Sequence, residues 1–218
     1  MKIAIIDYGV GNLKSISRLV ALSANFANIP VEVVVTCDPK VVCESDRIIL
    51  PGVGCFPNCW AKLQGVKGLA DALNHVAIAQ SKPVLGICVG MQLMASLSLE
   101  LRKTHGFNWI PGLVTRLMPF NCIRIPHIGW NIIDATLNHC LFKNIPLGQN
   151  GYNAYFAHSY HFDVANNCNL LATTLYGTRI TAAIVKDNLV GVQFHPEKSH
   201  ALGLLFLKNF ITWQIAKK

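Results

Sequence analysis

Charge is scarce in this sequence of 218 residues, and acidic side chains are the scarcest of the charged ones. Only 14% of the residues are charged, and 11 Asp and Glu stand against 19 Lys and Arg, which gives a formal net charge of +8. Hydrophobic residues make up 52% of the chain. That composition excludes an intrinsically disordered protein and allows a sizeable core. With no linker or internal repeat in view, we expect a single domain over residues 1–218.

Long apolar runs are also missing. No uninterrupted apolar stretch reaches the roughly 18 to 20 residues that a transmembrane helix requires. The N-terminal run MKIAII meets Asp7 too early to form the apolar region of a signal peptide. These patterns predict a cytoplasmic protein that does not engage a membrane.

The sequence lacks the cysteine spacing of a disulfide framework or a metal site. Its eight cysteines are irregularly spaced in a long chain, so we expect most of them to be small apolar core residues. Cys55 and Cys59 are widely spaced for a ligand pair, Pro57 lies between them, and no second Cys or His pair has ligand spacing. We therefore expect no metal ion.

Basic residues do not cluster, and no dinucleotide-binding motif is complete. Lys and Arg are scattered with no run longer than two residues, so nucleic-acid binding is not expected. We expect the positive charge to serve an anionic substrate channel or an acidic protein partner instead. Gly9 and Gly11 begin a G-x-G-x-x-G pattern, but Lys14 stands where the third glycine belongs, which argues against NAD. We expect no cofactor.

The arrangement of apolar residues changes along the chain. In the first half, short apolar runs alternate with residues at helical spacing. The predicted strands there cover 2–7, 31–35, 47–50 and 83–87, and the predicted helices cover 15–22, 65–79 and a segment after Cys88 that reaches Leu97. From Gly106 onward the predicted strands follow one another directly, at 112–118, 128–133, 154–160, 170–176, 180–185 and 189–194, before a last helix at 199–214. The pattern predicts an α/β fold with a mostly parallel sheet flanked by helices and with additional antiparallel strands in the C-terminal half.

The segment from Pro83 to Gln92 has the pattern of a strand, a sharp turn and a helix. Gly86 and Gly90 lie two residues on either side of Cys88. Small residues at those positions let a strained turn lift one reactive side chain clear of a sheet, as in a nucleophile elbow, and a helix N-terminus favours thiolate. The alternative is a buried cysteine at a Gly-rich strand end. A base elsewhere in the chain would decide between the two.

A histidine and a carboxylate follow the last predicted strand. In His195-Pro196-Glu197 the proline fixes the backbone between a candidate general base and the acid that would orient it. Glu197 would accept the second imidazole N–H and stabilise the imidazolium that forms when His195 takes the thiol proton. Alone, such a histidine is more often a surface-turn residue, but the upstream Cys88 favours the catalytic interpretation.

The turn after the third predicted strand is rich in glycine. Its residues are Pro51-Gly52-Val53-Gly54, and glycines at a strand's carboxyl end let backbone amides point at a developing anion. A plain Pro-Gly turn is the simpler alternative. Because neighbouring strands in the sequence are commonly neighbours in the sheet, we expect this turn beside the Cys88 turn.

These motifs together resemble the class I glutamine amidotransferases with a Cys-His-Glu triad. Other motifs are similar to those of the glutaminase subunits of imidazole glycerol phosphate synthase, in the histidine pathway. They are Asp7-Tyr8-Gly9-Val10-Gly11-Asn12-Leu13-Lys14-Ser15, Pro126-His127-Ile128-Gly129-Trp130-Asn131, Phe156-Ala157-His158-Ser159-Tyr160 and Gln193-Phe194-His195-Pro196-Glu197-Lys198-Ser199. The resemblance runs nearly from end to end of the chain.

The resemblance implies a flavodoxin-like fold and a glutaminase that hydrolyses L-glutamine through a thioester. The implied nucleophile, base and orienting acid are Cys88, His195 and Glu197. Oxyanion-hole amides are implied at Gly52, Val53, Gly54 and Val89. The glutamine would be held by Gln92, Glu100, Ser159 and Tyr160. The ammonia would pass to a (β/α)8-barrel synthase subunit in a heterodimer, through a partner face that includes Asn12, Trp130, Tyr155 and Lys198.

Two departures from the family pattern leave alternatives open. Residues 96–107 keep Glu100 but lack the acidic, Gly-rich loop usual in the family, and His200 replaces the commoner Gln. A paralogue that supplies ammonia to a surface-polysaccharide sugar amination system is therefore an alternative. A non-catalytic scaffold is another, although the complete set of Cys88, His195 and Glu197 argues against it.

Overall fold

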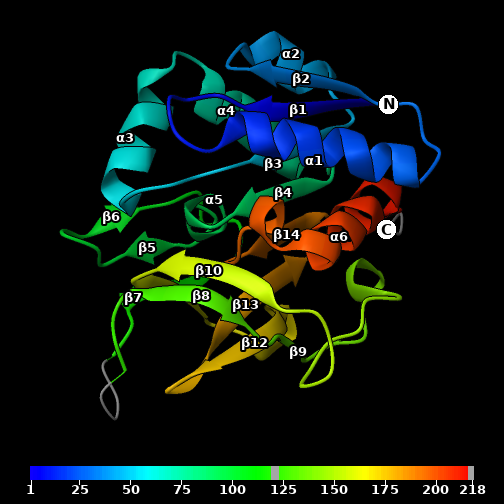
Figure 1. The fold of residues 1–218 in the computed structure, drawn as a ribbon. Coiled ribbons are helices and arrows are strands. Elements are labelled where there is room, and N and C mark those ends of the chain that lie inside the picture. Colours follow the sequence, from blue (N-terminus) through cyan, green and yellow to red (C-terminus); the bar gives the residue numbers. More distant parts are fainter. Residues whose placement is uncertain (119–122, 216–218) are drawn as a thin grey trace.

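A computed structural model describes residues 1–118 and 123–215 of the chain. Its centre is an eight-stranded sheet with the strand order β2-β1-β3-β4-β14-β13-β12-β9 (Figure 1). These strands are β1 (Lys2–Ile6), β2 (Glu32–Thr36), β3 (Arg47–Leu50), β4 (Val84–Ile87), β9 (Asp134–Ala135), β12 (Leu170–Tyr176), β13 (Thr178–Lys186) and β14 (Leu189–Val192). The apolar side chains of β1, β3 and β4 are buried, as expected for strands covered on both faces.

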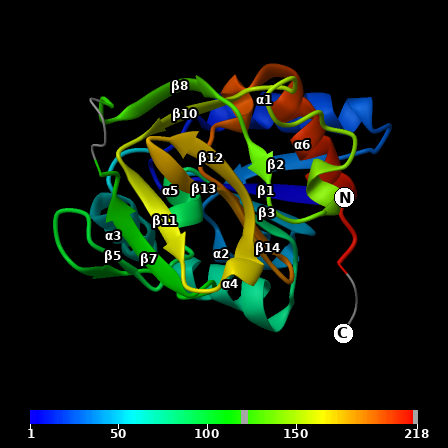
Figure 2. The same cartoon turned by 90° about the horizontal axis from the view of Figure 1, so that it is seen from below.

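The first five strands of this order run parallel, and the remaining pairs are antiparallel. Two helices, α1 (Leu13–Phe26) and α6 (His200–Thr212), pack together on one face of the sheet. The other face is covered by α2 (Pro39–Glu44), α3 (Phe56–Gly65) and α4 (Leu69–Asn74), as Figure 2 shows. The predicted α/β class, with its added antiparallel strands, is therefore confirmed.

Two smaller sheets are attached at the antiparallel end. One is a ribbon of β8 (His127–Asn131) and β10 (Ala154–His158), on the side of α1 and α6 (Figure 2). The other has the order β11-β7-β5-β6 and lies towards α3 and α4. Its strands are β5 (Leu97–Ser98), β6 (Thr104–His105), β7 (Gly112–Arg116) and β11 (Tyr160–Val164). The predicted strand at 154–160 is thus two strands of different sheets, with Ser159 between them.

Several helices differ from the predictions. The expected helix at 65–79 consists of α4 and the π-helix η1 (His75–Ala79), because Gly68 adopts a left-handed φ of 77° ahead of α4. The helices α2 and α3 were not predicted, and α3 begins where Pro57 occupies its first turn. The helix after Cys88, α5, spans only Val89–Gln92 and does not reach Leu97. Beyond α5, Leu93 and Met94 are apolar because they are buried in the core, and Leu97 begins β5.

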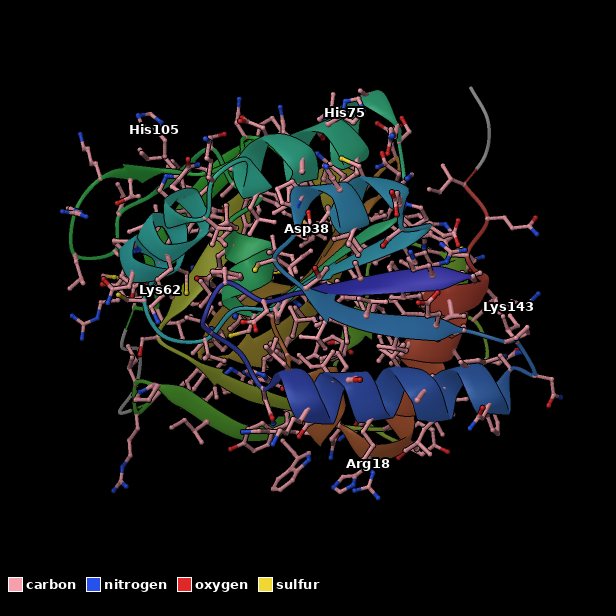
Figure 3. All side chains as sticks on the ribbon, turned by 90° about the horizontal axis from the view of Figure 1, so that it is seen from above. Arg18, Asp38, Lys62, His75, His105 and Lys143 are labelled. Carbon is pink, nitrogen blue, oxygen red and sulfur yellow. The ribbon has the colours of Figure 1, made fainter. Side chains whose placement is uncertain are left out.

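The cysteines and charges are distributed over the molecule. Among the described cysteines, all seven have free thiols but only Cys59 and Cys88 are buried, so the expectation of mostly core cysteines is wrong; Cys122 lies outside the described residues. Arg18 and Lys143 lie on separate parts of the surface (Figure 3), and Lys62 Nζ donates to the Gly9 carbonyl at 2.9 Å. Within the described ranges, no helix has the length and apolarity needed to cross a membrane.

Candidate active site

Cys88 lies at the turn between β4 and α5. Its backbone has φ 54° and ψ −112°, a strained conformation for a residue with a side chain. The turn is held by the Cys88 N–H, which donates to the Val192 carbonyl of the neighbouring parallel strand at 2.8 Å. The predicted nucleophile-elbow geometry is therefore present. However, α5 has only one turn, so its dipole adds little to the thiolate.

The two small residues around Cys88 are required by close backbone contacts. A Cβ atom built on Gly90 would stand 1.9 Å from the Leu50 carbonyl oxygen, and one on Gly86 would stand 2.6 Å from the Gly90 oxygen. A Cβ on Gly52 would be 2.6 Å from the Gly90 nitrogen. Three glycines from two neighbouring strand ends thus let the turns after β3 and β4 touch. This confirms the expectation that the Pro51–Gly54 turn lies beside Cys88.

His195 follows β14, whose residues pair in register with those of β4, Val192 with Ile87. Because parallel neighbours end at the same edge of a sheet, His195 and Cys88 meet there. The Nδ1 atom of His195 lies 3.0 Å from Glu197 Oε1, at the 3-10 helix η4 (Pro196–Lys198). This bond leaves Nε2 of His195 to face the thiol, and the Glu197 carboxylate is 2% exposed.

The environment of His195 favours its charged form. Burial alone would lower its pKa, but hydrogen bonds with Cys88 and Glu197, together with their negative charges, outweigh burial and raise the pKa to about 10. His195 therefore holds a proton at neutral pH whenever Cys88 is a thiolate. The arrangement can supply both a charged sulfur nucleophile and an acid for a leaving group.

A cavity of about 390 Å³ opens above Cys88 and His195. It brings together predicted residues from distant segments. Its lining includes Val53, Gly54, Val89, Gln92, Glu100, Ser159, Tyr160 and Lys198. Gly52 and Glu197 lie behind the lining, Gly52 against α5 and Glu197 against His195.

The candidate oxyanion amides do not yet face the cavity together. The N–H of Val89 donates to the Gly52 carbonyl oxygen at 3.4 Å. A carbonyl therefore occupies the donor that a developing oxyanion would need. The peptides on either side are also held: the Tyr8 hydroxyl donates to the Pro51 carbonyl at 2.6 Å, and the Cys59 thiol donates to the Val53 carbonyl at 3.3 Å.

Two of the predicted glutamine-binding side chains already have partners within the protein. Glu100 accepts the N–H of Phe56, the first residue of α3, at 2.7 Å, and burial raises the pKa of Glu100 despite this bond. The Gln92 amide nitrogen lies 3.0 Å from both the Tyr160 carbonyl and Gln193 Oε1. The Glu100 side chain therefore connects the divergent 96–107 segment to α3 as well as lining the cavity.

Sequence reasoning missed several polar residues of this region. Gln193 donates to Cys88 Sγ at 3.6 Å, and His158 lines the cavity. Tyr8 and Cys59 hold the strand beside the cavity, as described above. Gln193 stands two residues before His195 at the same strand end, which was a usable signal. No spacing in the sequence indicates Tyr8 or Cys59.

The predicted partner residues from β8, β10 and η4 form one surface cluster. Trp130 and Tyr155 pack edge to face with ring centroids 5.0 Å apart, and Lys198 Nζ lies 5.1 Å from the Tyr155 ring centroid. Trp130 is 58% exposed, which is unusual for so large an apolar side chain. Asn12 is exposed immediately before α1.

A family model identifies the class of this protein, and a solved structure shares its fold. A family model described as glutamine amidotransferase class-I matches residues 4–213. The chain belongs to the class I glutamine amidotransferase family. A crystal structure titled as a glutamine amidotransferase shares the fold with a TM-score of 0.67 at 15% identity, covering 95% of this chain and 98% of that one.

Two relatives of this chain carry the name of one particular amidotransferase subunit. The protein of Mesorhizobium japonicum named imidazole glycerol phosphate synthase subunit HisH is 50% identical over 215 residues, covering 98% of this chain and 100% of the relative. The protein of the same name from Brucella melitensis is 46% identical with the same coverage. The resemblance noted in the sequence therefore extends over essentially the full length of these relatives.

Proposed function

We propose that this chain is the glutaminase subunit of an imidazole glycerol phosphate synthase. It hydrolyses L-glutamine and delivers the ammonia to a (β/α)8-barrel synthase subunit in histidine biosynthesis. The observation that carries the proposal is the meeting of Cys88, on a strained turn, with His195 and Glu197 in the cavity wall. Family membership and the names of the relatives support it. A cytoplasmic location fits this role and stays a prediction.

The geometry accounts for hydrolysis in two covalent steps. The Cys88 thiolate attacks the side-chain amide carbon of glutamine, and protonated His195 gives its proton to the departing ammonia. A thioester remains on the sulfur. His195, now neutral, takes a proton from water, whose oxygen attacks the thioester, releases glutamate and returns the thiolate and imidazolium. Glu197 keeps the imidazole in the tautomer that directs Nε2 at the reaction.

The oxyanion hole forms in this proposal by rotation of one peptide. Turning the Gly52–Val53 peptide moves the Gly52 carbonyl away from the Val89 N–H and brings the Val53 N–H in its place. The Tyr8 hydroxyl anchors the Pro51 carbonyl on one side of this peptide, and the bond from the Cys59 thiol to the Val53 carbonyl on the other side opposes the rotation. Val53 is 41% exposed, so docking of a partner at this edge can reach it.

The surface cluster of Trp130, Tyr155 and Lys198 is the proposed docking face for the barrel subunit. Trp130 is exposed and Tyr155 is half-buried, and aromatic rings beside a cation are typical of the residues that dominate binding energy at interfaces. The sugar-amination alternative is not favoured, because the relatives at 46% and 50% identity carry the histidine-pathway name. The scaffold alternative leaves the Cys88, His195 and Glu197 arrangement without a use.

Labelling with a diazoketone analogue of L-glutamine tests the proposed nucleophile. The chain in complex with its barrel synthase is treated with the analogue, and the adduct is located by peptide mass mapping. We expect one adduct, on Cys88, that excess L-glutamine suppresses. Adducts spread over the exposed Cys37, Cys140 and Cys168, without protection by glutamine, would contradict the proposal.

A Glu197→Gln variant is expected to move the alkaline limb of the pH profile. Glu197 helps to raise the pKa of His195 to about 10, so its loss lowers that pKa and His195 loses its proton at lower pH. The profile of kcat/KM for glutamine hydrolysis in the complex should fall off at lower pH than in the wild type. At its maximum it should be reduced by about 10²- to 10⁴-fold. An unchanged alkaline limb would show that Glu197 does not act on His195.

A Cys59→Ala variant is expected to raise hydrolysis without the partner by several-fold. Burial raises the pKa of Cys59 to about 11, so the thiol keeps the proton that it donates to the Val53 carbonyl. Losing a bond worth about 0.5–1.5 kcal/mol favours the rotated peptide. Cys59→Ser keeps a donor and should behave like the wild type, and the exposed Cys37→Ala controls for loss of a thiol. Equal rates of glutamine hydrolysis without the partner in all of these variants would show that the bond from Cys59 to the Val53 carbonyl does not oppose the rotation.

A further inference from the structure

A continuous chain of hydrogen bonds leads from β8 to the sulfur of Cys88 through groups that take no part in the covalent steps of the proposed hydrolysis, although Gln92 and Tyr160 are also predicted to hold the glutamine. In order, it contains Asn131, His127, His158, the Tyr160 carbonyl, Gln92 and Gln193. The two imidazoles and the side chains of Gln92 and Gln193 are buried, and Asn131 is half-buried. Buried polar groups in such a chain determine one another's donor and acceptor roles, because each lost bond is costly.

The Gln193 end of the chain has a single consistent arrangement. The Tyr160 carbonyl can only accept, so the amide nitrogen of Gln92, 3.0 Å away, must face it. The same nitrogen donates to Gln193 Oε1 at 3.0 Å. Gln193 has then placed its oxygen towards Gln92, and its NH2 group necessarily points at Cys88 Sγ, 3.6 Å away.

The histidine end is determined in the same way. His158 Nδ1 lies 2.8 Å from the Tyr160 carbonyl and must carry a proton, which makes its Nε2 an acceptor. His127 Nδ1 then donates to His158 Nε2 at 3.0 Å. The remaining His127 Nε2 accepts from Asn131 Nδ2 at 3.2 Å. The Asn131 oxygen accepts the Ile132 N–H at 2.8 Å, which fixes that amide independently.

We propose that Gln193 is an additional residue of the active site that donates an N–H to the Cys88 sulfur. His127 and His158 are positioning residues that keep the NH2 group of Gln193 oriented towards the sulfur. His158 anchors the Tyr160 carbonyl, the carbonyl orients Gln92, and Gln92 orients Gln193. The inference rests on the proposed function in taking Cys88 as the nucleophile.

The packing keeps this chain in one protonation state. His127 is stacked between Phe156 and Tyr176, with ring centroids 4.6 and 3.9 Å away. Burial lowers the pKa of His127 to about 4 and that of His158 to about 3, so both stay neutral at physiological pH. A second proton on either ring would replace an acceptor by a donor and break the chain. The donor to Cys88 is therefore constant over the working pH range.

A hydrogen bond to the sulfur favours thiolate over thiol. Without the chain, Gln193 could turn its amide and place its oxygen against the sulfur, which would disfavour the thiolate. The charged or titratable groups that interact with Cys88 from other elements are His195, Tyr8 and Cys59. These three groups are kept in all variants compared below. Both His158 variants lack the imidazole, whose charge interacts with His195, so the difference between those two variants reports the Gln193 bond.

The pH dependence of Cys88 alkylation by iodoacetamide tests the inference in the full chain. Gln193→Met removes the donor at similar volume and is expected to move the midpoint of Cys88 alkylation upward by about one pH unit. In the complex it should lower kcat for glutamine about tenfold, with a smaller change in KM. Gln80→Met makes the same change at an exposed position and should match the wild type. Thermal unfolding establishes that each variant is folded.

A matched pair at His158 tests the positioning part. In His158→Asn the amide nitrogen can stand near the place of Nδ1 and still donate to the Tyr160 carbonyl, whereas His158→Gln offers a group near the place of Nε2 and loses that bond. We expect His158→Gln to raise the alkylation midpoint and His158→Asn to stay near the wild type. A purely structural role would lower stability in both and leave both midpoints unchanged.

The outcomes separate this inference from the proposed function. A midpoint that is unchanged in Gln193→Met and in both His158 variants would overturn the inference, whatever the activity. Failure of the wild type to hydrolyse glutamine would overturn the proposed function, while the alkylation midpoints would still measure the bond to Cys88. If Gln193→Met does not fold, the His158 pair decides the matter by the same measurement.

Discussion

A Cys88→Ala variant is expected to abolish glutamine-dependent synthesis, with a loss of at least about 10⁴-fold, while ammonia-dependent synthesis by the barrel subunit persists. Removing the sulfur removes the thioester, and neither His195 nor the cavity can replace a covalent nucleophile. Because Cys88 is 3% exposed and alanine is smaller, the turn between β4 and α5 is retained and the complex should still assemble. The measurement is product formation with L-glutamine and, separately, with ammonium salt at high pH.

The control for this experiment is the exposed Cys168, whose change to alanine should leave both activities intact. If Cys88→Ala supports glutamine-dependent synthesis at the wild-type rate, the chain acts as a scaffold and the proposed hydrolysis is wrong. Loss of ammonia-dependent synthesis as well would contradict the expected result, because the barrel subunit carries out that reaction itself.

A Gly90→Ala variant is expected to be the most destabilising single methyl addition near the site. The new Cβ would stand 1.9 Å from the Leu50 carbonyl oxygen and 2.8 Å from its carbon, and both belong to backbone that cannot rotate away. Overpacking of this kind costs about 3 kcal/mol of the free energy of unfolding. For a chain of this size each kcal/mol lowers Tm by about 2–4 °C, so we expect a Tm roughly 6–12 °C lower. Glutaminase activity should be lost in the folded fraction as well, because β3 and the elbow are pushed apart.

Gly65→Ala is the matched control for that variant. Gly65 ends α3, its Cβ position has no heavy atom within 4 Å, and its φ is not left-handed. The same substitution there should leave Tm unchanged or slightly raised, since alanine favours helix. Equal Tm values for the two variants, by calorimetry or circular dichroism, would show that the contact between the turns after β3 and β4 is looser than the structure indicates.

Much of the fold and the central pair of the site could be predicted because they depend on local pattern. Alternation of short apolar runs and helical segments predicts a parallel sheet, and side chains at the carboxyl ends of neighbouring strands meet. That reasoning brought Cys88 together with His195 from a distance of 107 positions in the sequence. The same reasoning failed after Gln92, where apolar residues at helical spacing predicted a longer helix. Those residues form a loop and β5, and they are apolar because they contact the core.

Local patterns in the amino-acid sequence were enough to predict that a cysteine stands on a glycine-flanked turn, that a histidine and a carboxylate share one rigid turn, and that both turns end strands of one sheet. The pairing of individual donors and acceptors became visible in the folded molecule alone: the Val89 N–H donates to the Gly52 carbonyl, the Phe56 N–H to the Glu100 carboxylate, and the Gln193 amide to the Cys88 sulfur. Periodicity and turn chemistry act over only a few residues. The direction of a buried amide or peptide depends on acceptors contributed by distant segments, which meet only when the sheet has formed.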